Sequence, residues 1–381
     1  MVLSFFYKKT YMEKELSKAV LLLEDGTIFY GKCAGKKGTS VGEICFNTGM
    51  TGYQEVFTDP SYYGQIVITT NVHIGNYGYN SNEAESNSMK ISGLICKDFN
   101  LDNSRSNSNG NIKDYFEKEN IFVISEVDTR SLVNYIRDKG AMNVLISSDT
   151  DNLDHLKNDL LKTPSMKGLD LSSFVSVDES YLLGNEKSKY RVAVYDFGVK
   201  KNILNCLEER DVFIKVFPYN TNPSEIFDWS PSGIFFSNGP GDPSSMKNVI
   251  GNIKTIIEKN IPVFGICLGH QLIALASGLK TYKMHNGHRG INHPVINLKT
   301  KRCEVTSQNH GFSIDEDSLF GKDNIEITHR NLNDNTIEGI KYINKPFFSV
   351  QYHPESSPGP QDSRYLFDQF IQNMKIFLGD D

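Results

Sequence analysis

Apolar and polar segments alternate regularly along the second half of the chain. Short apolar runs typical of buried strands are separated by segments whose apolar residues recur with helical spacing. The pattern predicts strands at residues 191–195, 212–216, 233–236 and 263–266, and helices at residues 201–209, 248–259 and 272–277. This alternation is typical of an α/β domain with a doubly wound, mostly parallel sheet, which later strands at 302–307 and 325–329 would extend.

The first half has a different pattern, in which short β-rich runs are divided by turn residues. A strand, a turn and a partner strand are predicted at 20–23, 24–27 and 28–30, and a further strand at 65–70. Asn- and Ser-rich segments at 80–88 and 100–111 predict exposed loops, and helical patterns follow at 112–119 and 130–139. We therefore expect a β-rich α/β domain to precede the doubly wound domain.

A polar segment at residues 178–189 separates the two patterns and is predicted to be a linker. The first domain would then span residues 19–180, and the doubly wound domain residues 190–381. Residues 1–18 precede both patterns, and we expect them to form a disordered extension in which Met12 is an alternative start.

Composition and charge narrow the classes of function. Of the 381 residues 39% are apolar and 23% are charged, which is typical of a globular protein. A net charge of −6 argues against non-specific nucleic-acid binding, and the chain has no apolar run of the 18 or so residues that a membrane span needs. The six cysteines are scattered without a Cys-x-x-Cys pair, which favours a reducing, cytoplasmic location over a disulfide framework.

The candidate chemistry centres on Cys267. An apolar strand runs into the sequence Gly265-Ile-Cys-Leu-Gly269, and a helical pattern follows. This is the nucleophile-elbow arrangement with sulfur in place of a hydroxyl oxygen. The positive amino end of the following helix favours a thiolate, and the flanking glycines permit a sharp turn. A buried core cysteine is the alternative interpretation.

Two further segments supply partners for such a thiol. His353 and Glu355 flank Pro354 after an apolar run, and in an extended segment residues two apart face the same way. Glu355 could then orient the imidazole while His353 moves protons, which makes a Cys–His–Glu triad. The sequence Ser-Asn-Gly-Pro-Gly-Asp-Pro at 237–243 follows a buried strand, and its backbone N–H groups could face an oxyanion.

In order and spacing, these three segments resemble the class I, triad-type glutamine amidotransferases, whose domain is flavodoxin-like. The resemblance implies hydrolysis of the glutamine side-chain amide through a γ-glutamyl thioester. Cys267 would be the nucleophile, His353 the base and acid, and Glu355 its orienter. The implied oxyanion and substrate contacts come from Gly239, Gly241, Leu268 and Gln271.

The first half resembles a narrower family, the small subunit of carbamoyl phosphate synthase. The match includes the sequence Gly-Glu-Ile-Cys-Phe-Asn-Thr-Gly-Met-Thr-Gly-Tyr-Gln-Glu at 42–55, Thr-Asp-Pro-Ser-Tyr at 58–62 and His-Ile-Gly-Asn at 73–76. It continues in the second half with Ser-Gln-Asn-His-Gly-Phe at 307–312 and covers nearly the whole chain from about residue 19. By this resemblance Asn309, Gly311 and Phe312 hold the amino-acid end of glutamine.

The resemblance also implies a partner. The chain has neither a P-loop nor a Gly-x-Gly-x-x-Gly motif, so no cofactor is expected on it. A large subunit would bind ATP, Mg²⁺ and bicarbonate and receive the ammonia, and the first domain, without a catalytic signature, would dock that subunit. The carbamoyl phosphate would enter arginine or pyrimidine biosynthesis.

One position departs from the family pattern. Gly49 stands where a serine that contacts glutamine is usual, so glutamine should bind more weakly, by about 0.5–1.5 kcal/mol for one lost hydrogen bond. A Gly49→Ser variant is then expected to have a lower KM.

Two other patterns are interpreted as ordinary structure without a chemical role. His285, His288 and His293 are interspersed with glycines, which favours a loop near the substrate mouth over a metal site. The pair Lys200–Lys201 is expected to be a solvated face.

Three alternatives remain open. The chain could be the amidotransferase of another synthase, although those lack the first domain. It could be a non-catalytic glutamine-binding regulator, or a free-standing cysteine hydrolase. A glutaminase assay with and without a large subunit distinguishes them.

Overall fold

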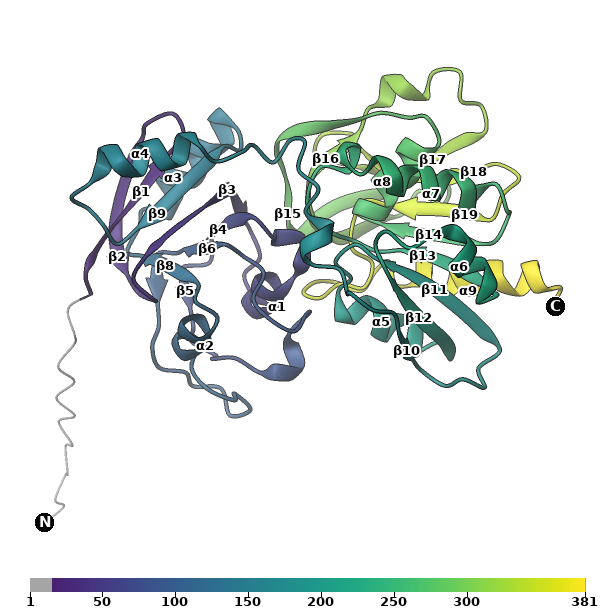
Figure 1. Cartoon of the computed structure of the whole chain (residues 1–381), viewed down its shortest axis with the longest axis horizontal. Helices are drawn as coiled ribbons and strands as arrows, with labels where there is room; N and C mark the ends of the chain where they lie inside the picture. The colour runs from purple at the N-terminus through teal and green to yellow at the C-terminus, as the bar shows by residue number, and fades with distance from the viewer. Residues whose placement is uncertain (1–15, 381) are drawn as a thin grey trace, which may run out of the picture.

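The computed structural model describes residues 16–380 and has two lobes, the first half of the chain forming one and the second half the other (Figure 1). Residues 1–15 of the expected extension at 1–18 lie outside the described residues. At its end, Ser17 already accepts a backbone hydrogen bond from Cys33, and the first strand begins at Lys18. Within residues 16–380, every helix falls short of the length and apolarity that a membrane crossing needs.

The first lobe is built around a closed barrel in the strand order β1-β2-β8-β6-β4-β3-β9. Alternate residues of each strand fill its interior with Ile, Leu and Val side chains. The barrel strands are β1 (Lys18–Leu23), β2 (Ile28–Cys33), β3 (Thr39–Asn47), β4 (Gln65–Thr69), β6 (Gly93–Ile95), β8 (Phe122–Ser125) and β9 (Asn143–Ser147). The other elements of this lobe are α1 (Tyr53–Thr58), α2 (Ile112–Lys118), α3 (Thr129–Lys139), α4 (Leu153–Leu161), and the two-stranded sheet of β5 (His73–Ile74) and β7 (Asp98–Phe99).

The second lobe contains a ten-stranded sheet in the order β10-β12-β11-β13-β14-β19-β18-β17-β15-β16. Its five parallel strands are β12 (Val212–Pro218), β11 (Tyr190–Asp196), β13 (Gly233–Phe236), β14 (Val263–Ile266) and β19 (Phe347–Val350). Antiparallel strands extend this core at both sides: β10 (Tyr181–Leu183), β18 (Ile337–Tyr342), β17 (Ile325–Asn331), β15 (Thr281–Asn297) and β16 (Cys303–Ile314). The predicted doubly wound, mostly parallel fold is confirmed for the core of the sheet.

Helices cover both faces of the parallel core (Figure 1). One face packs against α6 (Pro223–Asp228), α7 (Lys247–Ile257) and α8 (Leu268–Ala276). The other face packs against α5 (Lys201–Glu208) and α9 (Tyr365–Leu378). The parallel strands are buried on both sides, which explains why they read as continuous apolar runs. Short 3₁₀ helices lie at η1 (Pro60–Tyr62), η2 (Ser81–Glu83), η3 (Ser172–Phe174), η4 (Pro243–Ser245) and η5 (Glu316–Leu319).

Two expectations about the second half are wrong. The segment at 178–189 is more than a linker, because it contains β10, which pairs antiparallel with β12. The histidine-rich segment expected to be a loop is β15, a 17-residue strand. Its polar, Gly-containing sequence shows no alternation of apolar and polar residues. The segment is a strand because it pairs with β16. The register of that pairing shifts between Lys283 and His288 and between Gly290 and His293.

Candidate active site

Cys267 occupies the sharp turn between β14 and α8. Its backbone has φ 53° and ψ −103°, a conformation that costs energy for a residue with a side chain and is typical of a nucleophile elbow. The turn is fixed on both sides, since the Cys267 N–H donates to Val350 O and the Gly269 N–H donates to Ser237 O. The thiol is 3% exposed and lies 3.5 Å from Asn309 O.

The two glycines around Cys267 are required by close packing. A Cβ atom on Gly269 would lie 2.2 Å from Phe236 O, and one on Gly265 would lie 2.5 Å from the side chain of Ile273. The missing side chain of Gly269 therefore lets α8 approach β13, and that of Gly265 lets α8 approach β14. These contacts set the position of the thiol at the carboxyl end of the sheet.

His353 and Glu355 follow β19 and lie against the elbow. His353 Nδ1 and Glu355 Oε1 are 2.8 Å apart, and both side chains are buried. The segment is a turn rather than the expected extended strand, and only His353 forms an isolated bridge with Ser307. His353 Nε2 has no hydrogen-bond partner among the described residues, so it remains available to a substrate or to the thiol.

Lys200 lies behind the carboxylate. Its Nζ donates to Glu355 Oε1 at 2.8 Å and to Ser357 O at 2.6 Å, and its side chain is 2% exposed. The expectation that Lys200 belongs to a solvated face is therefore wrong. Lys201, its neighbour in sequence, is exposed. A sequence does not distinguish the two lysines, because the carboxylate that selects one of them lies 155 residues further along.

These contacts shift the ionisation of the buried groups. Burial lowers the pKa of His353, but the Glu355 carboxylate and the Cys267 thiol raise it, to about 10. Burial raises the pKa of Glu355, but Lys200 and His353 lower it, to about 2. Burial lowers the pKa of Lys200, but Glu355, Glu85 and Asp59 raise it above its ordinary value. The site therefore holds a charged carboxylate and a protonated imidazole beside the thiol.

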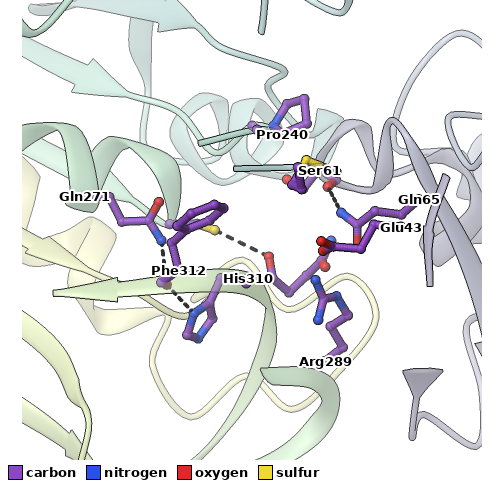
Figure 2. A pocket seen from close by; sticks show the side chains of 14 residues that line it. Glu43, Ser61, Gln65, Pro240, Gln271, Arg289, His310 and Phe312 are labelled. Carbon is purple, nitrogen blue, oxygen red and sulfur yellow. Dashed lines mark hydrogen bonds between the residues drawn. The ribbon is translucent and has the colours of Figure 1, made fainter. Parts of the chain in front are cut away.

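A small cavity opens beside Cys267. Six of the residues predicted to contact glutamine line it: Gly239, Gly241, Gln271, Asn309, Gly311 and Phe312. Gln271 is fixed by hydrogen bonds from Nε2 to Phe312 O (2.8 Å) and to Gln351 Oε1 (3.0 Å). Figure 2 shows Gln271 and Phe312 at one side of the cavity and Glu43 and Gln65 at the other.

Two backbone N–H groups predicted to form an oxyanion hole come from the turn of Cys267 and from the loop after β13. Leu268 is the first residue of α8, so its N–H has no intrahelical partner. Gly239 lies in the loop after β13, where a Cβ atom would come within 2.1 Å of Phe197 O. Neither N–H donates a hydrogen bond within the described part of the chain.

The structure does not bring Gly49 to this cavity. Gly49 lines a separate small cavity with Asn47 and Thr51, and its N–H donates to Asn47 Oδ1 at 2.7 Å. A Cβ atom at Gly49 would lie 2.8 Å from the same Asn47 oxygen. The effect of this glycine on glutamine affinity stays a prediction.

The first lobe supplies wall residues that the sequence interpretation missed. Glu43, Ser61 and Gln65 line the cavity, together with Arg289 of β15. The lobes are joined here by hydrogen bonds from Asn309 Nδ2 to Asp59 Oδ2 (3.0 Å) and from Asn238 Nδ2 to Ser61 Oγ (2.8 Å). Glu43 and Ser61 lie inside the stretches that carry the family resemblance, whereas Gln65 and Arg289 lie outside them and had no signal in the sequence.

The elbow, the His–Glu pair and the glycine loop at the end of a parallel sheet define a class I glutamine amidotransferase domain. A family model described as "Glutamine amidotransferase class-I" matches residues 193–373. A second, described as "Carbamoyl-phosphate synthase small chain, CPSase domain", matches residues 21–146.

Whole-chain relatives agree with both models. Proteins named carbamoyl phosphate synthase small chain are 47% identical in Buchnera aphidicola subsp. Acyrthosiphon pisum, 46% in Pectobacterium atrosepticum and 46% in Clostridium acetobutylicum. These matches cover 95%, 95% and 93% of this chain and 97%, 98% and 99% of the relatives. The chain belongs to the carbamoyl phosphate synthase small chain family.

Proposed function

We propose that this chain hydrolyses the side-chain amide of glutamine and passes the ammonia to a carbamoyl phosphate synthase large subunit. The observation that carries the proposal is the constellation of Cys267 in a strained elbow, beside a cavity, with the buried pair of His353 and Glu355 against it. The family of the chain supports the acceptor reaction, since its relatives are named small chains of that synthase.

The chemistry proceeds in two steps. The Cys267 thiolate attacks the amide carbon, a C–S bond forms, and His353 gives its proton to the departing nitrogen as the C–N bond breaks. Ammonia leaves, and a γ-glutamyl thioester remains on Cys267. Water then gives a proton to His353 and attacks the thioester, which releases glutamate and restores the thiolate. The N–H groups of Leu268 and Gly239 would stabilise the oxyanion in both steps.

The cavity walls suit an amino acid with both of its charges. Gln271, Asn309, Gly311 and Phe312 would hold the amino-acid end of glutamine, with Gly241 beside the reacting amide. Arg289 and Glu43 place one positive and one negative group on the same wall, which would complement the α-carboxylate and the α-ammonium group.

The remaining chemistry belongs to the partner. Free ammonia is protonated in water at neutral pH, so its use requires a closed route to the acceptor. The large subunit would bind ATP, Mg²⁺ and bicarbonate, and this reaction needs no cofactor on the present chain. A cytoplasmic location fits the free state of all six cysteines.

A Cys267→Ala substitution tests the proposal. In complex with the large subunit, the variant should lose glutamine-dependent synthesis and keep synthesis from added ammonia, because only the nucleophile is removed. The matched control is Cys303→Ala, since Cys303 is the exposed cysteine of the chain and should leave both activities unchanged.

Two outcomes would contradict the proposal. Glutamine hydrolysis at the native rate by Cys267→Ala would exclude the thioester route. A glutaminase rate that does not respond to the large subunit would favour a free-standing hydrolase instead.

A further inference from the structure

Three buried side chains converge on one point of the antiparallel part of the second sheet, beside the glutamine cavity. His288 on β15 and His310 on β16 lie directly opposite one another in register, and Glu338 lies on β18. One ligand atom of each lies within 4.8 Å of the other two. His288 Nδ1 and Glu338 Oε1 are 3.5 Å apart, and two ligands of a tetrahedral zinc ion are about 3.3 Å apart.

The outer nitrogen of each imidazole is already bound to an acceptor. Asp334 Oδ2 lies 2.7 Å from His288 Nε2, and Phe312 O lies 2.9 Å from His310 Nδ1. Figure 2 shows this contact of the His310 ring with the main chain of Phe312. Both acceptors need a proton on the nitrogen that they face, which leaves His288 Nδ1 and His310 Nε2 with inward lone pairs. A carboxylate or a carbonyl on the outer nitrogen is the usual second shell of a metal-bound histidine.

The centre of this cluster has more acceptors than donors. Gln308 Oε1 lies 3.0 Å from His288 Nδ1 and 2.9 Å from His310 Nε2, so an oxygen faces both lone pairs. Reversing the amide does not help, because its oxygen would then face Glu338 Oε1, now 3.0 Å from Gln308 Nε2. Either orientation needs a further proton on one of the two imidazoles or a metal ion between these atoms, although the Asn331 amide also lies 3.4 Å from His288 Nδ1.

A metal ion at this centre would also compensate the Glu338 carboxylate. Its side chain is fully buried, and its Oε2 has no hydrogen-bond partner within residues 16–380. Its Oε1 accepts from the amides of Gln308 and Asn331. A buried carboxylate is costly unless a positive charge compensates it.

We propose that His288, His310 and Glu338 bind a divalent ion of the zinc class, with Gln308 Oε1 as a fourth ligand. Two imidazoles and one carboxylate are a ligand set that zinc uses, and imidazole ligands disfavour Mg²⁺ and Ca²⁺. The sequence places His285 and His293 near His288, and its pattern favoured a loop over a metal site. The structure instead supplies His310 from the neighbouring strand.

The ion would connect three strands of the sheet at the glutamine cavity. His310 lines the cavity and is flanked by Asn309 and Gly311, which line it too. Zinc binding would therefore stabilise β15, β16 and β18 against separation. This proposal does not depend on the proposed catalytic activity, so its test uses metal content and thermal stability.

The test uses untagged full-length protein with Cys267→Ala, because the thiol of Cys267 could itself bind zinc. After treatment with a chelator, the protein is titrated with Zn²⁺ and, for its visible spectrum, with Co²⁺, and metal is measured after gel filtration. We expect about one ion per chain, tetrahedral Co²⁺ absorption and a higher Tm with Zn²⁺ but not with Mg²⁺.

Substitutions identify the ligands. Glu338→Gln keeps the shape of the side chain and should abolish binding, as should His288→Asn. Asp334→Asn should weaken zinc affinity by about 10–100-fold, because it removes the acceptor behind His288. His293→Asn is the matched control and should bind normally, since its ring lies 5.2 Å from that of His288 but contributes no converging ligand atom.

Three results would overturn the proposal. These are a parent protein that retains no zinc, a Glu338→Gln variant that binds as the parent does, and a Tm that changes with pH but not with Zn²⁺. The last result would mean that a proton alone occupies the centre. Should His288→Asn fail to fold, the near-isosteric Glu338→Gln carries the test, with circular dichroism of the metal-free protein as its folding control.

Discussion

Cys267 carries a positive φ that a residue with a side chain adopts only under constraint. Conformations of this kind cost about 1–3 kcal/mol, and the surrounding hydrogen bonds of Val350 and Ser237 maintain it. The strain aims the thiol at the cavity and at His353. The sequence predicted this position correctly, because the two flanking glycines and the apolar strand constrain the turn locally.

Lys200 is predicted to position Glu355, and Lys200→Met tests this. The variant removes one of the two positive partners of a buried carboxylate and leaves only His353, which should destabilise the fold by about 3 kcal/mol. It should also lower kcat for glutamine, by about 10²-fold if proton transfer by His353 is disturbed. Lys200 lowers the pKa of Glu355, so the acidic limb of the kcat/KM profile should move to higher pH.

Lys201→Met is the matched control, because Lys201 is adjacent and exposed. It should leave stability and the pH profile nearly unchanged. An unshifted acidic limb in Lys200→Met would show that the lysine acts on stability alone.

The charge of His353 should depend on the thiol next to it. Its folded pKa of about 10 lies above the ordinary value of 6.5, so protonation stabilises the fold. That stabilisation is fully present below about pH 6.5 and is lost as the pH rises through about 10. In Cys267→Ala the pKa of His353 should be lower, because the thiol helps to raise it. Titration of the imidazole by NMR checks this, and an unchanged value would mean that Glu355 alone holds the proton.

At the scale of elements, the packing of α8 on β13 depends on Gly269. Gly269→Ala would force a Cβ atom against Phe236 O and should destabilise the protein by about 1–3 kcal/mol in denaturant unfolding. Gly251→Ala on α7 is the matched control, since its Cβ would meet nothing within 4 Å. It should stabilise the protein by about 0.5–1 kcal/mol, because alanine suits a helix interior better. Equal effects of the two substitutions would contradict the packing argument.

Elements were predictable where local pattern and burial agree. The parallel strands β11, β12, β13 and β14 lie where their apolar runs placed them, within a few residues. The strand β15 was missed, because its polar and glycine-containing sequence has no strand period and its strand form comes from pairing with β16. Pairing partners distant in sequence leave no local signal.

At the scale of the whole molecule, the cavity lies where the two lobes meet. Asp59 caps η1 through Oδ1 and reaches Asn309 through Oδ2, so one carboxylate serves both lobes. Asp59→Asn would keep the cap but set two amide groups against each other. We expect a higher KM for glutamine, by about tenfold for one disrupted buried hydrogen bond, with little change in Tm.

Steady-state kinetics measures this effect, and Asp102→Asn in an exposed loop is the control. A KM equal to that of the control would show that the contact between lobes does not reach the substrate. The sequence could not predict this contact, because its partners are 250 residues apart and belong to different patterns. The resemblance identified the motifs of each half, and only the folded chain shows that they share a wall.

Both halves of the chain contribute to the cavity wall beside Cys267. A C-terminal half transferred alone would therefore carry the nucleophile without part of its substrate-binding wall. A hybrid gene that joins this C-terminal half to an unrelated N-terminal partner would transfer the thiol, the imidazole and the carboxylate without Glu43, Ser61 and Gln65. Recombination within the family should therefore preserve activity only when the cavity residues of both lobes come from the same parent protein, or when those of both lobes are substituted together.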